Sequence, residues 1–157
     1  MAIKSVSHIA LGVTDIERAL SFYRDVLGMA VDADYIQDLP PGGMDHELNK
    51  GRDIRRRQVW LRWGEAGPHA GALTIDQLFR PEPADRRGDI YDLGVHHFAF
   101  WVDDIDAVME RASAGGFRVI MPHEAQTHYY GEKEAGTIRS VFLYDADGNV
   151  VQCDQRG

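Results

Sequence analysis

The chain contains two copies of one pattern, and this internal repeat is the strongest constraint on how it can fold. The stretch "SHIALGVTDIERALSFYRDVLGM" (7–29) aligns, at first without gaps, with "HHFAFWVDDIDAVMERASAGGF" (96–117). In this alignment His8 falls on His97. The copies begin a little more than half a chain length apart in a sequence of 157 residues. The pattern therefore indicates an internal duplication.

Each copy begins with the alternation of a strand and continues with the spacing of a helix. In the second copy the strand would direct one set of side chains to one face and a second set to the other: Phe98, Phe100 and Val102 against His97, Ala99 and Trp101. The apolar face suits packing against a helix, whereas the face with histidine and small side chains suits a concave surface. Asp15 and Asp104 stand where a helix would begin, and aspartate is a good N-cap. His96 lies off the histidine face, so we expect it to pack or to cap.

Three strand-like segments follow each helix. In the first half they are residues 30–36, 54–63 and 72–79, and in the second half 117–121, 137–144 and 149–154. Each half therefore reads β-α-β-β-β, which predicts an α+β fold built from two tandem modules. We expect one domain over 1–157, made of a module 1–80, a charged linker 81–93 with prolines, and a module 94–157. The polar stretches 37–53 and 122–136 occupy matching places and are expected to be loops over a site.

Composition excludes several classes of function. The net charge of −8 disfavours nucleic acid as a partner. The chain has a single cysteine, Cys153, so a disulfide within the chain is impossible. No apolar run reaches transmembrane length, and the first residues lack the apolar core of a signal peptide. We therefore expect a cytoplasmic protein with no membrane partner. The three arginines at 55–57 are either solvated charge or part of an anion site.

Three segments carry a resemblance to a known family: "SHIALGVTDIERALSFYRDVLGM", "HHFAFWVDDIDAV" and "SVFLYDADGNVVQCD". With the duplicated order, they resemble the vicinal oxygen chelate superfamily, which includes glyoxalase I, methylmalonyl-CoA epimerase, extradiol dioxygenases, fosfomycin-modifying enzymes and bleomycin resistance proteins. The resemblance covers nearly the whole chain. It implies a glyoxalase-like, cupped mixed sheet, one divalent metal ion held by the first and last strands of each half, and a homodimer.

The resemblance carries two metal ligands to His8 and His97, and both lie on the face that turns away from the helices. The third position falls on Gln152, where the family usually has glutamate. The fourth falls on Gln77, judged from its spacing to the following proline. Counting by strand face instead would turn Asp76 toward the histidine, so both residues remain candidates.

This ligand set departs from the family in its charge. Two histidines and two carboxamides form a neutral site, and amide oxygens hold Mn, Mg or ferrous ions more weakly than carboxylates do. If Asp76 replaces Gln77, the set of two histidines and one carboxylate suits Fe(II), Ni, Co or Zn. Asp154 shares a strand face with Gln152 and could also approach the ion. The expected cofactor is a divalent ion, with Fe, Mn, Ni, Co and Zn all open.

The resemblance implies a metal-dependent lyase or isomerase, of the glyoxalase or epimerase kind. Its substrate would be a small chelating oxygenated molecule that reacts through an enolate-type intermediate. Gln152 cannot act as the base, so Glu47 and Tyr130 are the catalytic candidates, chosen for their place in the two loops. One alternative is a metal-free binding or resistance protein of the bleomycin-binding type, which the missing glutamate favours. A second is an extradiol-type dioxygenase, which "AGTIRSVFLY" disfavours because it lacks a histidine.

Overall fold

The structure is a computed structural model, and it describes residues 4–41, 48, 50–82, 93–127, 131 and 133–157. The chain divides into two compact units, Met1–Arg86 and Arg87–Gly157. Each unit is one module of the repeat. No helix among the described residues is long and apolar enough to cross a membrane.

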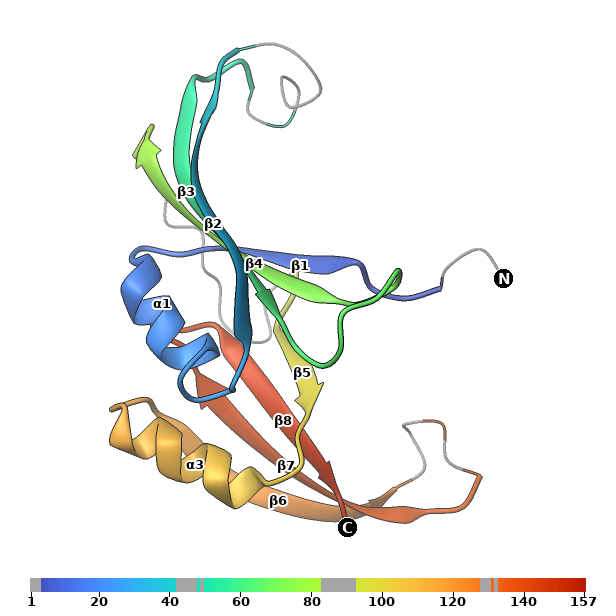
Figure 1. Cartoon of the computed structure of the whole chain (residues 1–157). Helices are drawn as coiled ribbons and strands as arrows, with labels where there is room; N and C mark the ends of the chain where they lie inside the picture. Colours follow the sequence, from blue (N-terminus) through green and yellow to red (C-terminus); the bar gives the residue numbers. More distant parts are fainter. Residues whose placement is uncertain (1–3, 42–47, 49, 83–92, 128–130, 132) are drawn as a thin grey trace. The chain divides into compact units, whose positions relative to one another are not determined.

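The first module is a four-stranded sheet with a helix on one face (Figure 1). Its elements are β1 (His8–Gly12), α1 (Ile16–Tyr23), β2 (Ala30–Leu39), β3 (Ile54–Arg62) and β4 (Ala72–Arg80). The strand order is β1-β4-β3-β2. Strand β1 runs parallel to β4, and the other neighbouring strands are antiparallel.

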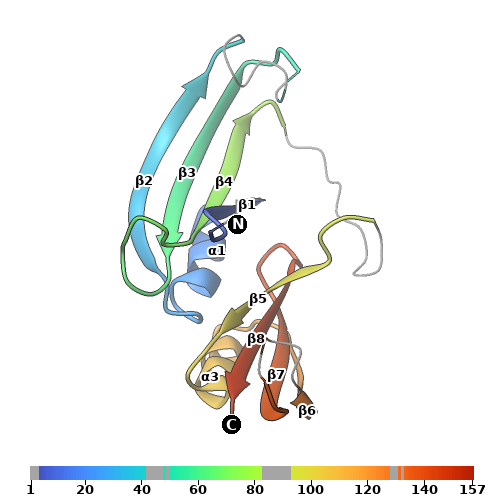
Figure 2. The same cartoon turned by 90° about the vertical axis from the view of Figure 1, so that its right-hand side faces the viewer.

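The second module repeats this arrangement, with its own helix on one face of its sheet (Figure 2). Its elements are β5 (His97–Trp101), α3 (Ile105–Ala114), β6 (Val119–Thr127), β7 (Gly136–Tyr144) and β8 (Val150–Arg156). The strand order is β5-β8-β7-β6, with β5 parallel to β8. The prediction of two tandem βαβββ modules of mixed sheet is confirmed.

Two strands extend into stretches that were expected to be loops: β2 ends at Leu39 rather than at residue 36, and β6 shows the larger extension. Residues 117–121 were expected to form it and 122–136 to be a loop, but β6 runs over Val119–Thr127. Pairing with β7 continues past an irregularity between Ile120 and His123. Backbone hydrogen bonds to β7 therefore maintain β6 as a strand, although its polar side chains do not show the alternation of apolar and polar residues that predicts one.

Both helices begin as the sequence predicts. The Asp15 carboxylate accepts a hydrogen bond from the backbone N–H of Arg18 at 3.0 Å, and Asp104 accepts one from Ala107 at 3.0 Å. An aspartate in this role satisfies an N–H that has no partner within the helix. The equivalence of the two caps confirms the alignment of the repeat at its strand-to-helix turn.

The core of each module lies between the sheet and its helix. In the first module Ile16, Leu20 and Tyr23 of α1 are buried, as are Leu73 and Ile75 of β4. Because side chains alternate along a strand, burying residues 73 and 75 against α1 turns residues 74 and 76 to the opposite side. The face of each sheet that turns away from its helix is called the open face below.

Cys153 lies in the core of the second module and has no exposed surface. Burial raises the pKa of its thiol to about 12. Since the thiolate is the reactive form, we expect iodoacetamide at pH 8 to leave the folded protein unmodified. In urea the thiol returns to an ordinary pKa of about 8.5 and should react fully. Intact-mass measurement checks both states, and labelling of the folded chain would contradict the burial.

Candidate functional site

The open face of the first module carries His8 against an aromatic side chain. The imidazole lies 5.4 Å, centroid to centroid, from the indole of Trp60 on β3. Trp60 is in turn opposite Thr74 on β4. The Ser7 hydroxyl lies 3.2 Å from Nδ1 of His8, so Nε2 is the ring nitrogen that suits a ligand. The open face thus offers one exposed imidazole backed by an indole.

Asp76 lies on the same face, at the centre of a hydrogen-bonded cluster. Its Oδ1 accepts a hydrogen bond from Nε2 of Gln58 at 2.7 Å and pairs with the Arg56 guanidinium at 3.2 Å. Gln58 Oε1 accepts from the Tyr35 hydroxyl at 2.6 Å and from the Trp60 indole N–H at 3.0 Å. Desolvation raises the pKa of Asp76, although Arg56, Gln58, Thr74 and His8 act in the opposite direction. The carboxyl group is therefore partly buried and electrostatically linked to His8.

Gln77 points the other way. Its Oε1 accepts a hydrogen bond from the backbone N–H of Ile16, the first residue of α1, at 3.1 Å. Its neighbours at 73 and 75 are buried on that side as well. The expectation that Gln77 shares a face with His8 is therefore wrong, and the alternative, Asp76, occupies the open face. Plain alternation along β4 decides between them, and the spacing to the proline does not.

The second module contains the same strand-to-helix hydrogen bond. Gln155 Oε1 accepts from the backbone N–H of Ile105 at 2.8 Å, just as Gln77 does from Ile16. Gln77 therefore corresponds to Gln155. Gln152 corresponds to Thr74, because each lies opposite an aromatic residue of the neighbouring strand.

Replacing Gln77 by alanine should lower the free energy of unfolding and leave the affinity for metal unchanged. The first N–H of α1 would lose its partner, and a lost hydrogen bond of this kind costs about 1 kcal/mol. Gln155→Ala should have a similar cost in the second module. Urea unfolding measures both, and a titration with Co²⁺ checks the metal. A Gln77→Ala protein of unchanged stability with weakened metal binding would contradict the assignment.

The open face of the second module carries His97 in the same setting as His8. Its imidazole lies 5.6 Å from the ring of Phe142, edge to face. Phe142 on β7 is opposite Gln152 on β8, as Trp60 is opposite Thr74. In both modules, the histidine of the first strand thus lies against an aromatic residue two strands away in the same sheet.

Asp154 completes this second face and is 2% exposed. Its Oδ1 accepts a hydrogen bond from Nε2 of Gln152 at 2.7 Å and another from the Ser140 hydroxyl. The corresponding residue in the first module is Asp76, which Gln58 holds in the same manner. Each open face therefore contains a histidine that lies against an aromatic ring and an aspartate that accepts hydrogen bonds from neighbouring side chains.

The structure places the remaining candidates as follows. Glu47 and Tyr130 lie outside the described residues, so their catalytic roles stay predictions. His96 lies just before β5, with its ring 5.7 Å from that of His97. Within the described part of the chain, no three histidine, cysteine, aspartate or glutamate residues form a group that could hold a metal ion.

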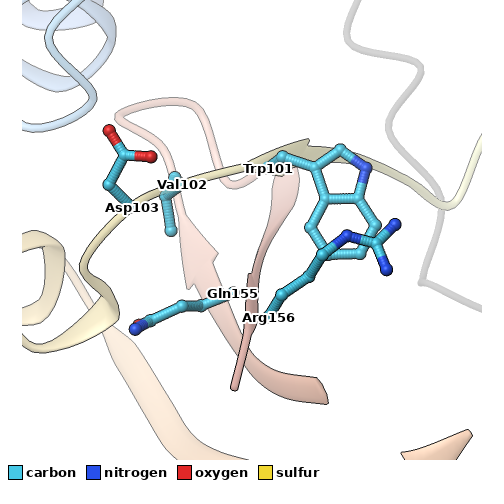
Figure 3. Close-up of a pocket in the computed structure, with 5 residues that line it drawn as sticks. All are labelled: Trp101, Val102, Asp103, Gln155 and Arg156. Carbon is cyan, nitrogen blue, oxygen red and sulfur yellow. The ribbon is translucent and has the colours of Figure 1, made fainter. Parts of the chain in front are cut away.

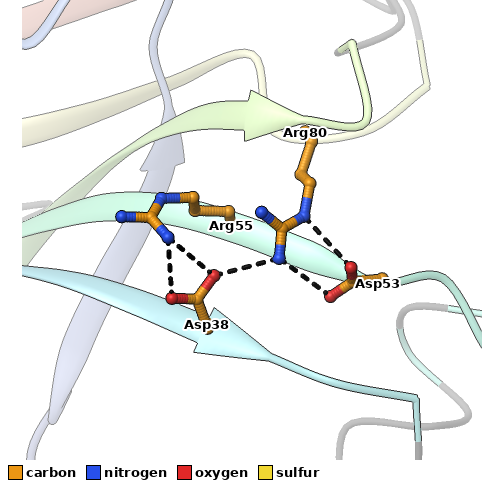
Figure 4. Close-up of polar contacts among 4 residues, drawn as sticks. All are labelled: Asp38, Asp53, Arg55 and Arg80. Atoms are coloured by element: carbon orange, nitrogen blue, oxygen red, sulfur yellow. Dashed lines mark hydrogen bonds and ion pairs between the residues drawn. The ribbon is translucent and has the colours of Figure 1, made fainter.

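The arginines at 55–57 are all ion-paired. Arg56 pairs with Asp76 on the open face, and Arg57 pairs with Asp34 and Glu17 at 2.6 and 2.7 Å. Figure 4 shows the third pairing, in which Arg55 and Arg80 share Asp38 and Arg80 also contacts Asp53. Because each guanidinium already has a carboxylate partner, the run does not present an uncompensated anion site.

A small pocket lies at the end of β5 and β8, beside the start of α3 (Figure 3). It is lined by Trp101, Val102, Asp103, Gln155 and Arg156. The Arg156 guanidinium stacks over the Trp101 indole, 4.2 Å from the ring centroid. The Gln155 amide oxygen, which lines the pocket, accepts a hydrogen bond from the first N–H of α3. This pocket contains neither His97 nor Gln152.

Comparison with known proteins gives consistent results. The model of the Glyoxalase/Bleomycin resistance protein/Dioxygenase superfamily matches residues 5–153. A 2-epi-5-epi-valiolone epimerase from an Actinomyces species is 30% identical over 127 residues, which are 78% of this chain and 66% of that protein. An ethylmalonyl-CoA/methylmalonyl-CoA epimerase from Cereibacter sphaeroides is 28% identical over 96% of both chains.

Among solved structures, a glyoxalase family protein from Bacillus cereus superimposes with a TM-score of 0.73 over 99% of this chain and 98% of the other. Their sequences are 15% identical, so this likeness concerns the fold. The family model, by contrast, spans almost the whole sequence and contains both copies of the repeat. The chain therefore belongs to the Glyoxalase/Bleomycin resistance protein/Dioxygenase superfamily, as its repeat and motifs predicted.

Proposed function

We propose that this protein is an isomerase or lyase of the glyoxalase type. It removes a proton from a carbon next to a carbonyl group of a small oxygenated substrate and returns a proton, through an enolate-type intermediate. Membership of the superfamily and the two relatives named epimerases support this proposal. The observation that carries it is the repeated open face, where His8 and His97 each lie against an aromatic ring.

The donor chemistry of the open faces fits the divalent ion that such enzymes use. His8 and His97 are exposed imidazoles at equivalent places of the repeat, and we propose both as ligands. Gln152 and Asp76 offer oxygen donors on the same faces, with Asp76 in place of Gln77. Two histidines with one carboxylate suit Fe(II), Ni, Co or Zn. When bound, such an ion stabilises negative charge that develops on a substrate oxygen.

The chain must also supply a group that takes the proton. Gln152 has no basic atom, so it can orient a substrate or hold the ion but cannot act as the base. Glu47 and Tyr130 are the proposed proton-transfer residues. The aromatic rings of Trp60 and Phe142 lie against these imidazoles of His8 and His97, both of which remain exposed to solvent.

Solvent exchange tests the proposed chemistry directly. The protein, loaded separately with Co²⁺, Ni²⁺, Mn²⁺ or Fe²⁺, is incubated in heavy water with ethylmalonyl-CoA, methylmalonyl-CoA or 2-epi-5-epi-valiolone. Formation of an enolate should introduce one deuterium, which mass spectrometry detects. Glu47→Gln should slow the exchange if Glu47 is the base. If no metal form introduces deuterium into any of the three compounds, the epimerase chemistry is wrong for them.

A metal-free binding protein is the second candidate, and one observation favours it. The carboxylates of both open faces are engaged by protein donors: Asp76 by Gln58 and Arg56, and Asp154 by Gln152 and Ser140. A face whose carboxylates are already hydrogen-bonded to protein donors suits a ligand held between aromatic rings. Metal analysis of protein purified without a histidine tag separates the two candidates. A stoichiometric ion supports the enzyme, and its absence at every loading concentration supports the binding protein.

The homodimer and the cytoplasmic location stay predictions. Light scattering of the full chain measures the mass in solution, and a mass of one chain would contradict the dimer. The expected partner is a small molecule rather than a nucleic acid or a membrane, which agrees with the net charge of −8.

A further inference from the structure

The geometry of the second open face points to a positioning role for Asp154. We propose that Asp154 holds the Gln152 carboxamide in one orientation and places beside it the negative charge that glutamine lacks. This inference rests on the proposed function, because it concerns how Gln152 serves a divalent ion. Asp154 is 2% exposed, and its Oδ1 receives the Gln152 Nε2 donor at 2.7 Å and the Ser140 hydroxyl.

The carboxylate fixes which end of the amide faces it. A carboxylate only accepts hydrogen bonds, whereas a carboxamide has one accepting end and one donating end. With the amide turned over, two oxygens would meet at the distance that now separates Asp154 from the Gln152 nitrogen. The contact therefore requires the NH₂ group on the Asp154 side and directs the carbonyl oxygen away from it. Oxygen is the end of an amide that binds a divalent ion.

The first module shows the same rule at work. Gln58 donates its NH₂ group to Asp76, and its oxygen accordingly accepts from the Tyr35 hydroxyl and the Trp60 indole. In both modules, the aspartate at the equivalent position of the repeat thus determines which end of a glutamine side chain donates and which end accepts. In the first module the oxygen of Gln58 accepts hydrogen bonds from other side chains of the protein. In the second the glutamine stands at the position where the family places its ligand.

Charge adds to orientation. A hydrogen bond from an amide NH₂ to a carboxylate polarises the amide and increases the electron density on its oxygen. Buried carboxylates beside metal-binding histidines act in this manner, and their loss typically costs about 10–100-fold in metal affinity. Asp154 and Gln152 together would then replace a single glutamate, with the charge one hydrogen bond further from the ion.

The test is a Co²⁺ titration followed by visible absorption, which reports both affinity and ligand geometry. Asp154→Asn removes the charge and lets the amide of Gln152 turn, so we expect affinity to fall about 10–100-fold and the spectrum to change. The matched control is Asp106→Asn. It removes one negative charge from the same module, where Asp106 pairs with Arg139 at 2.9 Å and is exposed. The control should bind Co²⁺ like the unchanged protein.

A double variant separates positioning from mere support of the fold. Gln152→Glu with Asp154→Asn exchanges donor and acceptor while keeping their contact, and moves the charge to residue 152. We expect this protein to fold and to bind Co²⁺ at least as tightly as the unchanged chain. If the double variant folds but binds no better than Asp154→Asn, the inference is overturned. It is also overturned if Asp154→Asn alone folds and binds within about twofold of the unchanged chain.

The titration of the unchanged chain distinguishes the two proposals. If it binds no Co²⁺, the metal-dependent function fails, and the role of Asp154 fails with it. If it binds Co²⁺ and the Asp154 variants behave like the control, only the positioning role fails. Circular dichroism of each variant accompanies the titration, so that a loss of affinity is compared only among folded proteins.

Discussion

Replacing His97 by alanine is expected to reduce Co²⁺ affinity more than 100-fold and to abolish deuterium exchange. The change removes a proposed ligand, so its effect should exceed the roughly 10–100-fold cost of losing a residue that only supports a ligand. His8→Ala should behave in the same way, because His8 and His97 occupy equivalent positions and each lies against an aromatic ring. Co²⁺ titration and mass spectrometry of the substrate measure the two effects.

The neighbouring histidine provides the matched control. His96→Ala removes an imidazole one residue from His97, but the equivalent position in the first copy of the repeat is Ser7, and His96 precedes strand β5. Although its ring lies 5.7 Å from that of His97, the repeat assigns the ligand role to His97 alone, so His96→Ala should leave Co²⁺ affinity and exchange within about twofold of the unchanged protein. If His96→Ala were as damaging as His97→Ala, the assignment from the repeat would be wrong.

The repeat made much of the fold predictable. Alternation in the first strand of each copy separated the histidine face from the helix face, and the aspartates at 15 and 104 marked the helix starts. These features are local, since a strand has a period of two and a cap acts within one turn. Local rules hold in both modules because the same sequence pattern meets the same neighbours in each.

The position of Gln77 follows from the internal repeat of the last strands. The last strands contain "TIDQ" at 74–77 and "QCDQ" at 152–155. Aligning these two segments pairs Asp76 with Asp154 and Gln77 with Gln155, which is the correspondence that the structure shows. The spacing to a proline gave a different register because it compared the chain with a family motif and not with its own second copy.

Other members of the open faces could not be predicted. Gln58 and Ser140 contact their aspartates across neighbouring antiparallel strands. Such contacts depend on the register between strands, which the loop lengths and the irregularities in pairing determine. Neither residue belongs to a motif that the sequence distinguishes. Their role emerges only when the strands are placed side by side.

Leu73→Ala is expected to lower the free energy of unfolding of the first module by about 2–5 kcal/mol, through lost burial and the cavity that remains. Leu73 has no exposed surface and lies on the helix side of β4. A loss of this size is a large part of the roughly 5–15 kcal/mol that typically holds a domain folded. Urea unfolding followed by fluorescence measures it, with Trp60 and Trp63 as reporters in this module.

Val6→Ala is the control for this prediction, because Val6 is 63% exposed and its truncation should change stability by less than about 0.5 kcal/mol. The comparison also bears on the site. Leu73 is followed on β4 by Thr74 and Asp76, which face the opposite side, so its packing against α1 holds the backbone that presents them. Leu73→Ala should therefore weaken Co²⁺ binding only under conditions that unfold the first module. Weakened binding in a fully folded Leu73→Ala protein would show that the core also sets the fine geometry of the open face.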